Sequence, residues 1–237
     1  MSAESERIYE EAQKRMALLP NYYAWIASHF AEHVRGRVLE LGCGAGLVIR
    51  NYIARADSVL GVDLDPALLA RLEAQYPGGK VRTARADLLG DWHELGGFRA
   101  DVIVALDVLE HFADDGAFVA KLRRQLEPGG RVVLKVPAQT RLYSAIDEAS
   151  GHFRRYDAQP LAQLMAAHGF RTLLLRHMNA AGAWGYRLKR QRRSGFSLTF
   201  SPGKLRCVNA LIPALALLDR LPGLKGLSLV GVFELQR

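Results

Sequence analysis

Three glycines at alternate positions are the first residues whose types and spacing could do chemistry. Gly42, Gly44 and Gly46 follow directly on a short apolar run that begins at Arg37. Glycine adopts a positive φ at little cost and lets a ligand approach the backbone closely. We therefore expect a buried strand, a sharp turn and, at that turn, the floor of a ligand site.

Three aspartates farther along the chain could complete this site. Asp63, Asp87 and Asp107 each follow an apolar segment of the length of a strand. Asp63 could accept hydrogen bonds from both hydroxyls of a ribose, and Asp87 could meet the exocyclic amine of an adenine. Each aspartate alone could instead cap a helix. Three acids after three successive strands indicate a nucleoside-like ligand, because parallel sheets bind ligands beyond the carboxyl ends of their strands.

His152 is the side chain best suited to remove a proton, since its reference pKa lies near neutrality. The alternative is a structural histidine that bonds a loop carbonyl. Arg154 and Arg155 could hold a carboxylate or phosphate through paired hydrogen bonds, or pair with the acidic residues between 147 and 157.

His111 could face the same cleft or contact the start of a helix. Glu110 and His111 could also share a metal ion, but two residues do not define a metal site. We predict no metal site from the sequence.

Alternating apolar and amphipathic segments must position these side chains. The expected strands span 37–41, 58–63, 81–86, 101–106, 131–136, 170–176 and 227–235, and the expected helices 47–56, 66–76, 114–126 and 158–168. This alternation predicts an α/β fold with a doubly wound, mostly parallel sheet.

Two further helices are expected at residues 4–18 and 21–30, with Asn21 as the N-cap of the second. Tyr22, Tyr23 and Trp25 come just before the glycine turn. They belong either to the core or to a lid over the ligand. We divide the chain into N-terminal helices at 1–35, a core at 36–177 with 227–237, and an inserted helical cap at 178–226, which is too long for a plain connection.

The formal charge of +8 raises nucleic acid, anionic lipid and anionic substrates as partners. Much of it lies in residues 187–193, which could also be a solvated helix face. Aromatic residues alternate with these cations, and residues 205–221 are strongly apolar. Residues 184–221 could shelter a hydrophobic acceptor or touch an anionic membrane, or form a lid packed on the sheet or on another subunit.

Cysteine usage and the N-terminus indicate the compartment. Cys43 and Cys207 are the two cysteines, so no disulfide framework or cysteine-rich zinc pattern is expected. The charged N-terminus is unlike a signal peptide, and residues 208–218 are too short an apolar run to span a bilayer. We expect a cytoplasmic protein, with peripheral membrane contact through 184–221 as a second possibility and no prediction of its oligomeric state.

Four segments in a fixed order resemble the class I S-adenosylmethionine-dependent methyltransferases. They are Glu40-Leu-Gly-Cys-Gly-Ala-Gly46, Gly61-Val-Asp63, Ala86-Asp87 and Asp107-Val-Leu-Glu-His111, followed by Pro128-Gly-Gly130. The likeness covers about residues 36–176. It implies a Rossmann-like, seven-stranded sheet whose last strand runs antiparallel beside strand six, and S-adenosyl-L-methionine as the cofactor.

The resemblance also implies roles for single residues. The implied cofactor-binding residues are Glu40, Gly42, Cys43, Gly44, Gly46, Asp63, Leu64, Asp87, Leu88 and Asp107. Asp63 would hold the ribose, Asp87 with Leu88 would frame the adenine, and Asp107 would lie near the sulfonium. The catalytic candidates are Asp107, His111 and His152.

The segment 147–156 is similar to a G-H-x-R-R-Y signature in a bacterial subgroup of these enzymes that acts on small molecules or on lipid- and sugar-linked metabolites. The segment around Asn21 is similar to that subgroup too. The residues expected to border the acceptor are Tyr22, Tyr23, Trp25, Tyr143, Arg154, Arg155 and Tyr156.

Methyl transfer from a sulfonium is an in-line displacement that needs mainly positioning, with a base only when the acceptor carries a proton of high pKa. We predict methylation of a small, hydrophobic or anionic acceptor at oxygen, with His152 as base or acceptor ligand. N-methylation of a small amine is the alternative.

Other classes fit the residues less well. An RNA or DNA amino-methyltransferase would carry Asn/Asp-Pro-Pro-aromatic where this chain has Asp107-Val-Leu-Glu110, and neither cysteine suits a cytosine mechanism. A nicotinamide oxidoreductase would want glycine in place of Leu47. A binding module without activity is the remaining alternative.

Overall fold

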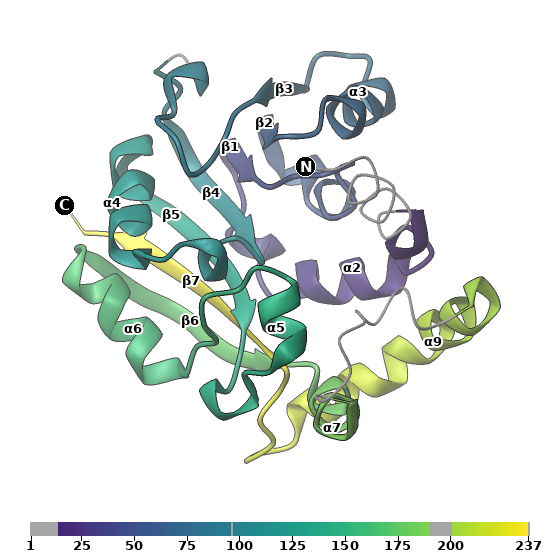
Figure 1. The fold of residues 1–237 in the computed structure, drawn as a ribbon. Coiled ribbons are helices and arrows are strands. Elements are labelled where there is room, and N and C mark those ends of the chain that lie inside the picture. The colour runs from purple at the N-terminus through teal and green to yellow at the C-terminus, as the bar shows by residue number, and fades with distance from the viewer. Residues whose placement is uncertain (1–13, 96, 190–200, 237) are drawn as a thin grey trace.

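The computed structural model describes residues 14–95, 97–189 and 201–236. A seven-stranded sheet with the order β3-β2-β1-β4-β5-β7-β6 forms its centre (Figure 1). The strands are β1 (Gly36–Leu41), β2 (Ala56–Asp63), β3 (Val81–Arg85), β4 (Ala100–Leu106), β5 (Leu126–Pro137), β6 (Phe170–Met178) and β7 (Ser228–Leu235). Only β7 runs antiparallel to its neighbours. The predicted fold class is confirmed.

Helices cover both faces of the sheet. The α-helices are α2 (Pro20–Ser28), α3 (Pro66–Gln75), α4 (Asp115–Gln125), α5 (Ala145–Ala149), α6 (Ala158–Ala167), α7 (Ala180–Lys189) and α9 (Pro202–Leu215). Successive strand residues point to opposite faces: Leu39 packs in a cluster with residues of α4 and α6, and Val38 in a second cluster with residues of α2, α3 and α9. Both faces of the central strands are therefore buried, which explains their continuous apolar sequence.

Short 3-10 helices occupy several connections. They are η1 (Ala31–His33), η2 (Ile49–Asn51), η3 (Ile53–Arg55), η4 (His93–Leu95), η5 (Leu109–His111), η6 (Thr140–Leu142) and η7 (Ala216–Arg220). The α-helix predicted at 47–56 is wrong, because η2 and η3 take its place. Val48, Ile49 and Ile53 are β-branched and weaken a helix. The Asn51 amide also donates to the carbonyls of residues 47 and 48, and such bonds compete with regular helix formation.

The start of one helix and the start of one strand also differ from the sequence prediction. Asn21 is not an N-cap, because Pro20 occupies the first turn of α2 and Leu19 stands at the cap position. The Asn21 side chain instead donates to the Asn209 carbonyl at 2.9 Å, and the Asn209 side chain accepts from the Asn21 backbone at 2.8 Å. The strand expected from Arg131 starts earlier, since β5 begins at Leu126. The helix expected at 4–18 lies mostly outside the described residues.

The segment between β6 and β7 forms α7, α9 and η7 in its described part, and α9 packs against α2. None of the described helices is long and apolar enough to cross a membrane. Figure 1 shows α2, α5 and α7 gathered around the ends where β4 and β5 terminate. These ends are where a parallel sheet of this kind binds its ligands.

Candidate functional site

The turn after β1 has the backbone that its glycines allow. Gly42, Gly44 and Gly46 have φ of 68°, 51° and 72°, in the left-handed region that other residues rarely adopt. A Cβ at Gly46 would stand 2.4 Å from the Leu72 Cδ1 of α3. The turn therefore needs glycine for its conformation and, at Gly46, for space.

Asp63 ties this turn to the end of β2. Its Oδ2 accepts a hydrogen bond from the Gly44 backbone at 2.8 Å, and its Oδ1 accepts one from the Asp65 backbone at 3.0 Å. Each carboxylate oxygen has two lone pairs, so each can accept a further hydrogen bond from a ligand. The carboxylate is held in one orientation at the carboxyl edge of the sheet.

Glu40 lies inside the protein, two residues before the turn. It is 4% exposed and accepts a hydrogen bond from the Tyr52 hydroxyl. Burial raises the pKa of Glu40 to about 8, although the bond from Tyr52 acts in the opposite direction. Cys43 is also buried, and burial raises the pKa of its thiol. The predicted contacts of these two residues with a cofactor stay predictions.

Apolar side chains stand exposed near the ends of β2 and β3. Leu64 is 55% exposed and Leu89, which the sequence analysis missed, is 66% exposed. Asp87 accepts a hydrogen bond from the Leu89 backbone at 2.9 Å, and Leu88 packs against the core. This part of the edge offers apolar contact for a flat ring beside a carboxylate.

A buried lysine organises the end of β4. Asp107 has a φ of 55°, and its carboxylate pairs with Lys135 Nζ at 2.6 Å. Lys135 is 3% exposed. Burial alone would lower the pKa of Lys135, but Asp107, Tyr22 and Glu110 together raise that pKa. The sequence analysis missed Lys135, although a lysine inside an apolar strand was a signal.

The helix α2 lies against this corner. Burial raises the pKa of Tyr22, and Lys135 and Asp107 are near enough to act on the same hydroxyl. Tyr23 lies beside Tyr22, with ring centroids 5.8 Å apart. Trp25 is buried in the core, which is one of the two alternatives that its position left open.

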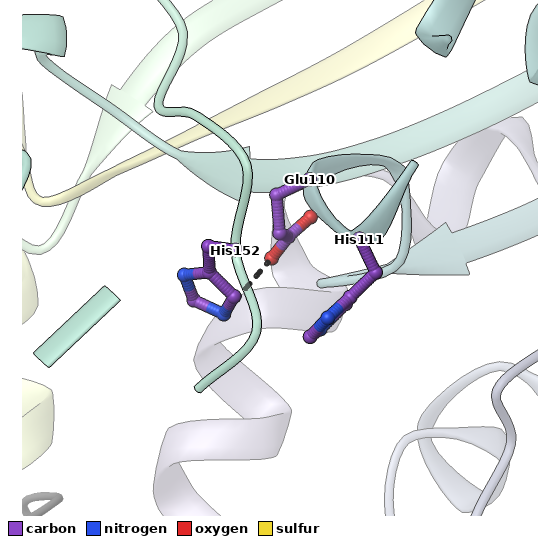
Figure 2. Close-up of side chains that lie close together, drawn as sticks. All are labelled: Glu110, His111 and His152. Carbon is purple, nitrogen blue, oxygen red and sulfur yellow. Dashed lines mark ion pairs between the residues drawn. The ribbon is translucent and has the colours of Figure 1, made fainter. Parts of the chain in front are cut away.

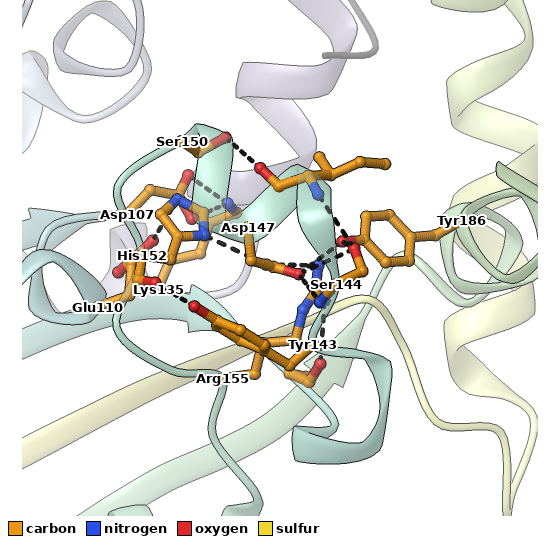
Figure 3. A network of polar contacts seen from close by, with 12 residues as sticks. Asp107, Glu110, Lys135, Tyr143, Ser144, Asp147, Ser150, His152, Arg155 and Tyr186 are labelled. Carbon is orange, nitrogen blue, oxygen red and sulfur yellow. Dashed lines mark hydrogen bonds and ion pairs between the residues drawn. The ribbon is translucent and has the colours of Figure 1, made fainter. Parts of the chain in front are cut away.

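The loop after β5 is built on Asp147 (Figure 3). Its carboxylate faces His152 Nδ1 at 3.2 Å, Arg155 Nη2 at 2.9 Å and the Tyr186 hydroxyl at 2.6 Å. Burial would raise the pKa of Asp147, but the hydrogen bonds from His152, Arg155 and Tyr186 outweigh it and hold that pKa at about 2. The sequence analysis did not predict this role for Asp147 or for Tyr186, which comes from α7.

Most of the G-H-x-R-R-Y side chains are engaged within the protein. Arg155 is buried against Asp147, which is the salt-bridge alternative of the sequence analysis. Arg154 pairs with Asp115 at 2.9 Å, and the Tyr156 hydroxyl donates to the same carboxylate at 3.2 Å. Their predicted contact with an acceptor stays a prediction.

Two other acceptor candidates on this loop, His152 and Tyr143, are partly exposed. The His152 side chain is 19% exposed, and Tyr143 is 38% exposed. The Tyr143 hydroxyl donates to the His152 carbonyl at 2.7 Å. Both remain candidates for contact with an acceptor.

Glu110, His111 and His152 converge at the same corner (Figure 2). Glu110 Oε1 lies 4.0 Å from His152 Nε2, and the two histidine rings are 4.9 Å apart in an edge-to-face arrangement. Glu110 is fully buried, and burial raises its pKa well above the ordinary value. The structure thus brings together His111 and His152, which lie far apart in the sequence.

Known proteins resemble this chain in sequence and in fold. A family described as a methyltransferase domain matches residues 9–175. A Mycolicibacterium smegmatis protein described as a probable S-adenosylmethionine-dependent methyltransferase is 31% identical over 148 residues, which cover 61% of this chain and 56% of that protein. A ubiquinone biosynthesis O-methyltransferase of Pseudomonas aeruginosa is 28% identical over 173 residues, which cover 70% of this chain and 69% of that enzyme. The chain spans about half the length of the first curated relatives that it matches.

Among solved structures, an S-adenosylmethionine-dependent methyltransferase from Mesorhizobium loti superposes with a TM-score of 0.57 at 20% identity. The match covers 85% of this chain and 92% of that one. At this identity the likeness establishes the fold alone, because one fold can host several functions.

Proposed function

This chain belongs to the methyltransferase domain family, and on that premise we propose that it transfers a methyl group from S-adenosyl-L-methionine to a small-molecule acceptor. When bound, the cofactor supplies an electrophilic methyl group on a sulfonium. The observation that carries the proposal is the hydrogen bond from Gly44 to Asp63, which joins the glycine turn to an oriented carboxylate at the sheet edge.

The residues present suit this cofactor. A nucleoside that lies against the turn needs backbone without side chains in its way. The glycines provide this, and a Cβ at Gly46 would also collide with Leu72 of α3. Asp63 keeps lone pairs for ribose hydroxyls, and Leu64 offers exposed apolar surface to an adenine. We propose that Asp87 accepts from the adenine amine.

We propose that the acceptor lies at the end of β4, beside Asp107 and His152. Asp147 faces His152 Nδ1 and orients the ring, so that Nε2 is directed towards Glu110. Nε2 is then the atom that meets the acceptor, as base for its proton or as its ligand. Tyr22 and Tyr23 on α2 would cover this corner as a lid.

We propose oxygen as the methylated atom. Several relatives are named ubiquinone biosynthesis O-methyltransferases, and His152 offers a group that can act on a hydroxyl. Nitrogen is the alternative. An amine with a free lone pair needs no base, so full turnover of an amine by a His152→Ala variant would favour it.

Cofactor binding is the first test of the proposal. In calorimetric titrations with S-adenosylhomocysteine, Asp63→Ala should weaken binding at least tenfold. Asp57→Ala is the matched control, because Asp57 is an exposed aspartate at the other end of the same strand. Absence of binding to the unmodified chain, or equal binding by Asp63→Ala, would contradict the proposal.

The acceptor class needs a second test. Methyl-labelled cofactor offered with phenols, catechols, carboxylic acids and amines should label an oxygen acceptor. Mass spectrometry of the product then distinguishes a methoxy group from a methylamine. Labelling of amines alone would replace O-methylation by N-methylation and leave methyl transfer itself intact.

We also propose that one face touches anionic membrane lipids. A cavity of about 720 Å³ is lined by Arg141, Arg187 and Lys225 together with Trp184 and Leu224. Trp184 is 73% exposed and Leu224 45%. Exposed cations next to exposed apolar side chains are the composition that binds an anionic bilayer surface.

Sedimentation with vesicles tests this surface. Binding to phosphatidylglycerol vesicles should fall several-fold in Arg187→Glu and in Trp184→Ala, and vesicles of phosphatidylcholine alone should bind weakly. Arg82→Glu on β3 is the charge-matched control, since Arg82 is an exposed arginine outside this cavity. Equal loss in Arg82→Glu would mean that net charge alone causes the binding.

A further inference from the structure

Glu110 is a buried carboxylate that lacks the partners such a group needs. It is 0% exposed, and neither of its side-chain oxygens has a hydrogen-bond partner among the residues that the structure describes. An unpaired carboxylate in the interior is costly unless it is neutralised or coordinates a cation. Nearby Lys135 does not donate a hydrogen bond to Glu110, because the Lys135 ammonium binds Asp107.

We propose that Glu110, His111 and His152 bind one divalent metal ion, of which zinc fits best. One ligand atom from each of the three side chains lies within 4.8 Å of the others (Figure 2). Two imidazole nitrogens and one carboxylate oxygen form a donor set that zinc accepts, with further positions left open.

The distances allow a site if the three side chains move closer together. With tetrahedral zinc bonds of about 2.0–2.2 Å, two ligand atoms lie about 3.3–3.6 Å apart. The widest separation of 4.8 Å must therefore shrink by roughly 1 Å when the ion binds. Glu110 and His111 are adjacent on η5 and His152 lies on the loop after β5, so the closure involves only these two short segments.

The surroundings of the two histidines support a metal site. Asp147 faces His152 Nδ1 at 3.2 Å, which leaves Nε2 as the coordinating atom. The Gly151 backbone lies beside the His111 ring. Histidine ligands of metals commonly give their second nitrogen to a carboxylate or a backbone carbonyl, which fixes the ring and the tautomer.

Arg155 and Tyr186 give this arrangement further rigidity. Both donate to Asp147, at 2.9 Å and 2.6 Å, and Arg155 also stacks on the Tyr186 ring at 4.2 Å. The carboxylate that orients His152 is thus itself fixed. Through these contacts of Tyr186, α7 packs against the loop after β5.

A bound ion would decide between the two roles left open for His152. As a ligand, His152 would hold the ion, and the ion would bind the acceptor oxygen and lower the pKa of its hydroxyl. The proton of that hydroxyl would leave to solvent, and the oxygen would keep the electron pair that attacks the methyl group. The bond from the methyl carbon to sulfur would break, and its electron pair would stay on sulfur in the departing S-adenosylhomocysteine. This catalytic role rests on the proposed function, whereas binding of the ion does not.

The test is metal binding by the full chain after treatment with a chelator. Equilibrium dialysis and calorimetry with zinc chloride should give one ion per chain, and cobalt(II) should give a visible absorption band of a nitrogen- and oxygen-ligated site. All proteins would carry Cys207→Ser, because Cys207 is an exposed thiol that could bind zinc by itself.

Variants identify the ligands. Glu110→Gln and His152→Ala should each weaken zinc binding more than tenfold, and Asp147→Asn should weaken it about 10- to 100-fold. His93→Ala is the control, since the His93 side chain is 89% exposed and lies on η4. Circular dichroism and melting curves would establish that each variant is folded. Asp147→Asn leaves all three ligands in place, so it gives a result even if Glu110→Gln does not fold.

Two outcomes would overturn the proposal. One is the absence of stoichiometric zinc on the chain that carries Cys207→Ser alone, and the other is equal zinc binding by folded Glu110→Gln or His152→Ala. Titration with S-adenosylhomocysteine separates this failure from that of the proposed function. Asp63→Ala should lose binding of S-adenosylhomocysteine and keep binding of zinc. Glu110→Gln should lose binding of zinc and keep binding of S-adenosylhomocysteine.

Discussion

At the scale of the residue, the raised pKa of Glu40 predicts how the stability of the fold depends on pH. Its pKa rises from about 4.5 to about 8 in the folded chain. Between these values the folded state holds the proton and the unfolded chain releases it. The contribution of Glu40 to the free energy of unfolding is therefore fully present below pH 4.5. It falls as the pH rises towards 8, by at most about 1.4 kcal/mol per pH unit.

Glu40→Gln should flatten this dependence. We expect the free energy of unfolding of the variant, measured with denaturant from pH 5 to pH 8, to lose the decline that the unmodified chain displays. Glu94→Gln serves as the control, because Glu94 is exposed. A variant with the same slope as the unmodified chain would show that Glu40 is not the group responsible.

Lys135 and Asp107 differ in burial, and this difference predicts unequal effects. The Lys135 side chain is 4% exposed and the Asp107 side chain 49%. Asp107→Asn should destabilise the fold by about 3–5 kcal/mol, because it leaves a buried ammonium without its partner. Lys135→Met should cost much less, since the remaining carboxylate can reach water.

A double-mutant cycle in denaturant checks this asymmetry. The variant with both Asp107→Asn and Lys135→Met should recover most of the stability, because an apolar replacement of a buried pair is often neutral. Asparagine tolerates the left-handed φ of residue 107, so backbone strain is held constant. Equal destabilisation by the two single variants would contradict the burial argument.

At the scale of the element, the glycine turn allows a matched comparison. Gly46 and Gly79 both have a φ of 72°, but only at Gly46 would a Cβ meet a neighbour, Leu72 Cδ1. Gly79→Ala should cost roughly 1 kcal/mol from the left-handed backbone alone. Gly46→Ala should cost more and should also weaken S-adenosylhomocysteine binding.

Melting curves and calorimetry would measure both effects. Gly79→Ala should bind the nucleoside ligand as the unmodified chain does, because it lies outside the proposed cofactor site. If Gly46→Ala bound it equally well and melted at the same temperature as Gly79→Ala, the turn would not have the tight packing described here.

The elements that could be predicted are those with a strong local pattern. The buried strands are continuous apolar runs, and α3 has Asp65 at its cap and Pro66 in its first turn. Residues 47–56 are apolar enough for a helix, but β-branched side chains and the Asn51 amide break it into two 3-10 turns. The five-residue helix α5 rests on a capping box at Ser144, too short a signal to stand out in the sequence.

At the scale of the whole molecule, the sequence predicted more of the proposed cofactor site than of the proposed acceptor site. Asp63 and the glycines lie in local motifs whose order fixes their place in the sheet. The contact of Tyr186 with Asp147 joins α7 to the loop after β5, and the bonds between Asn21 and Asn209 join α2 to α9. No periodic pattern pairs such distant residues, so the sequence alone could not give these contacts.

The cluster of Glu110, His111 and His152 illustrates the same limit. The sequence places Glu110 beside His111, and two residues did not define a metal site. Folding of the loop after β5 adds His152 as a third ligand. Within the described part of the chain Glu110 is buried without a hydrogen-bond partner, and this property of the packed molecule supports the further inference.

The central claim is that this chain holds the methyl donor at the carboxyl edge of its sheet. A crystal structure of the full chain with S-adenosylhomocysteine tests it most directly. We expect the nucleoside over the turn of Gly42, Gly44 and Gly46, with its ribose hydroxyls on Asp63 and its sulfur facing the corner of Asp107. A nucleoside bound elsewhere, or a ribose without contact to Asp63, would contradict it.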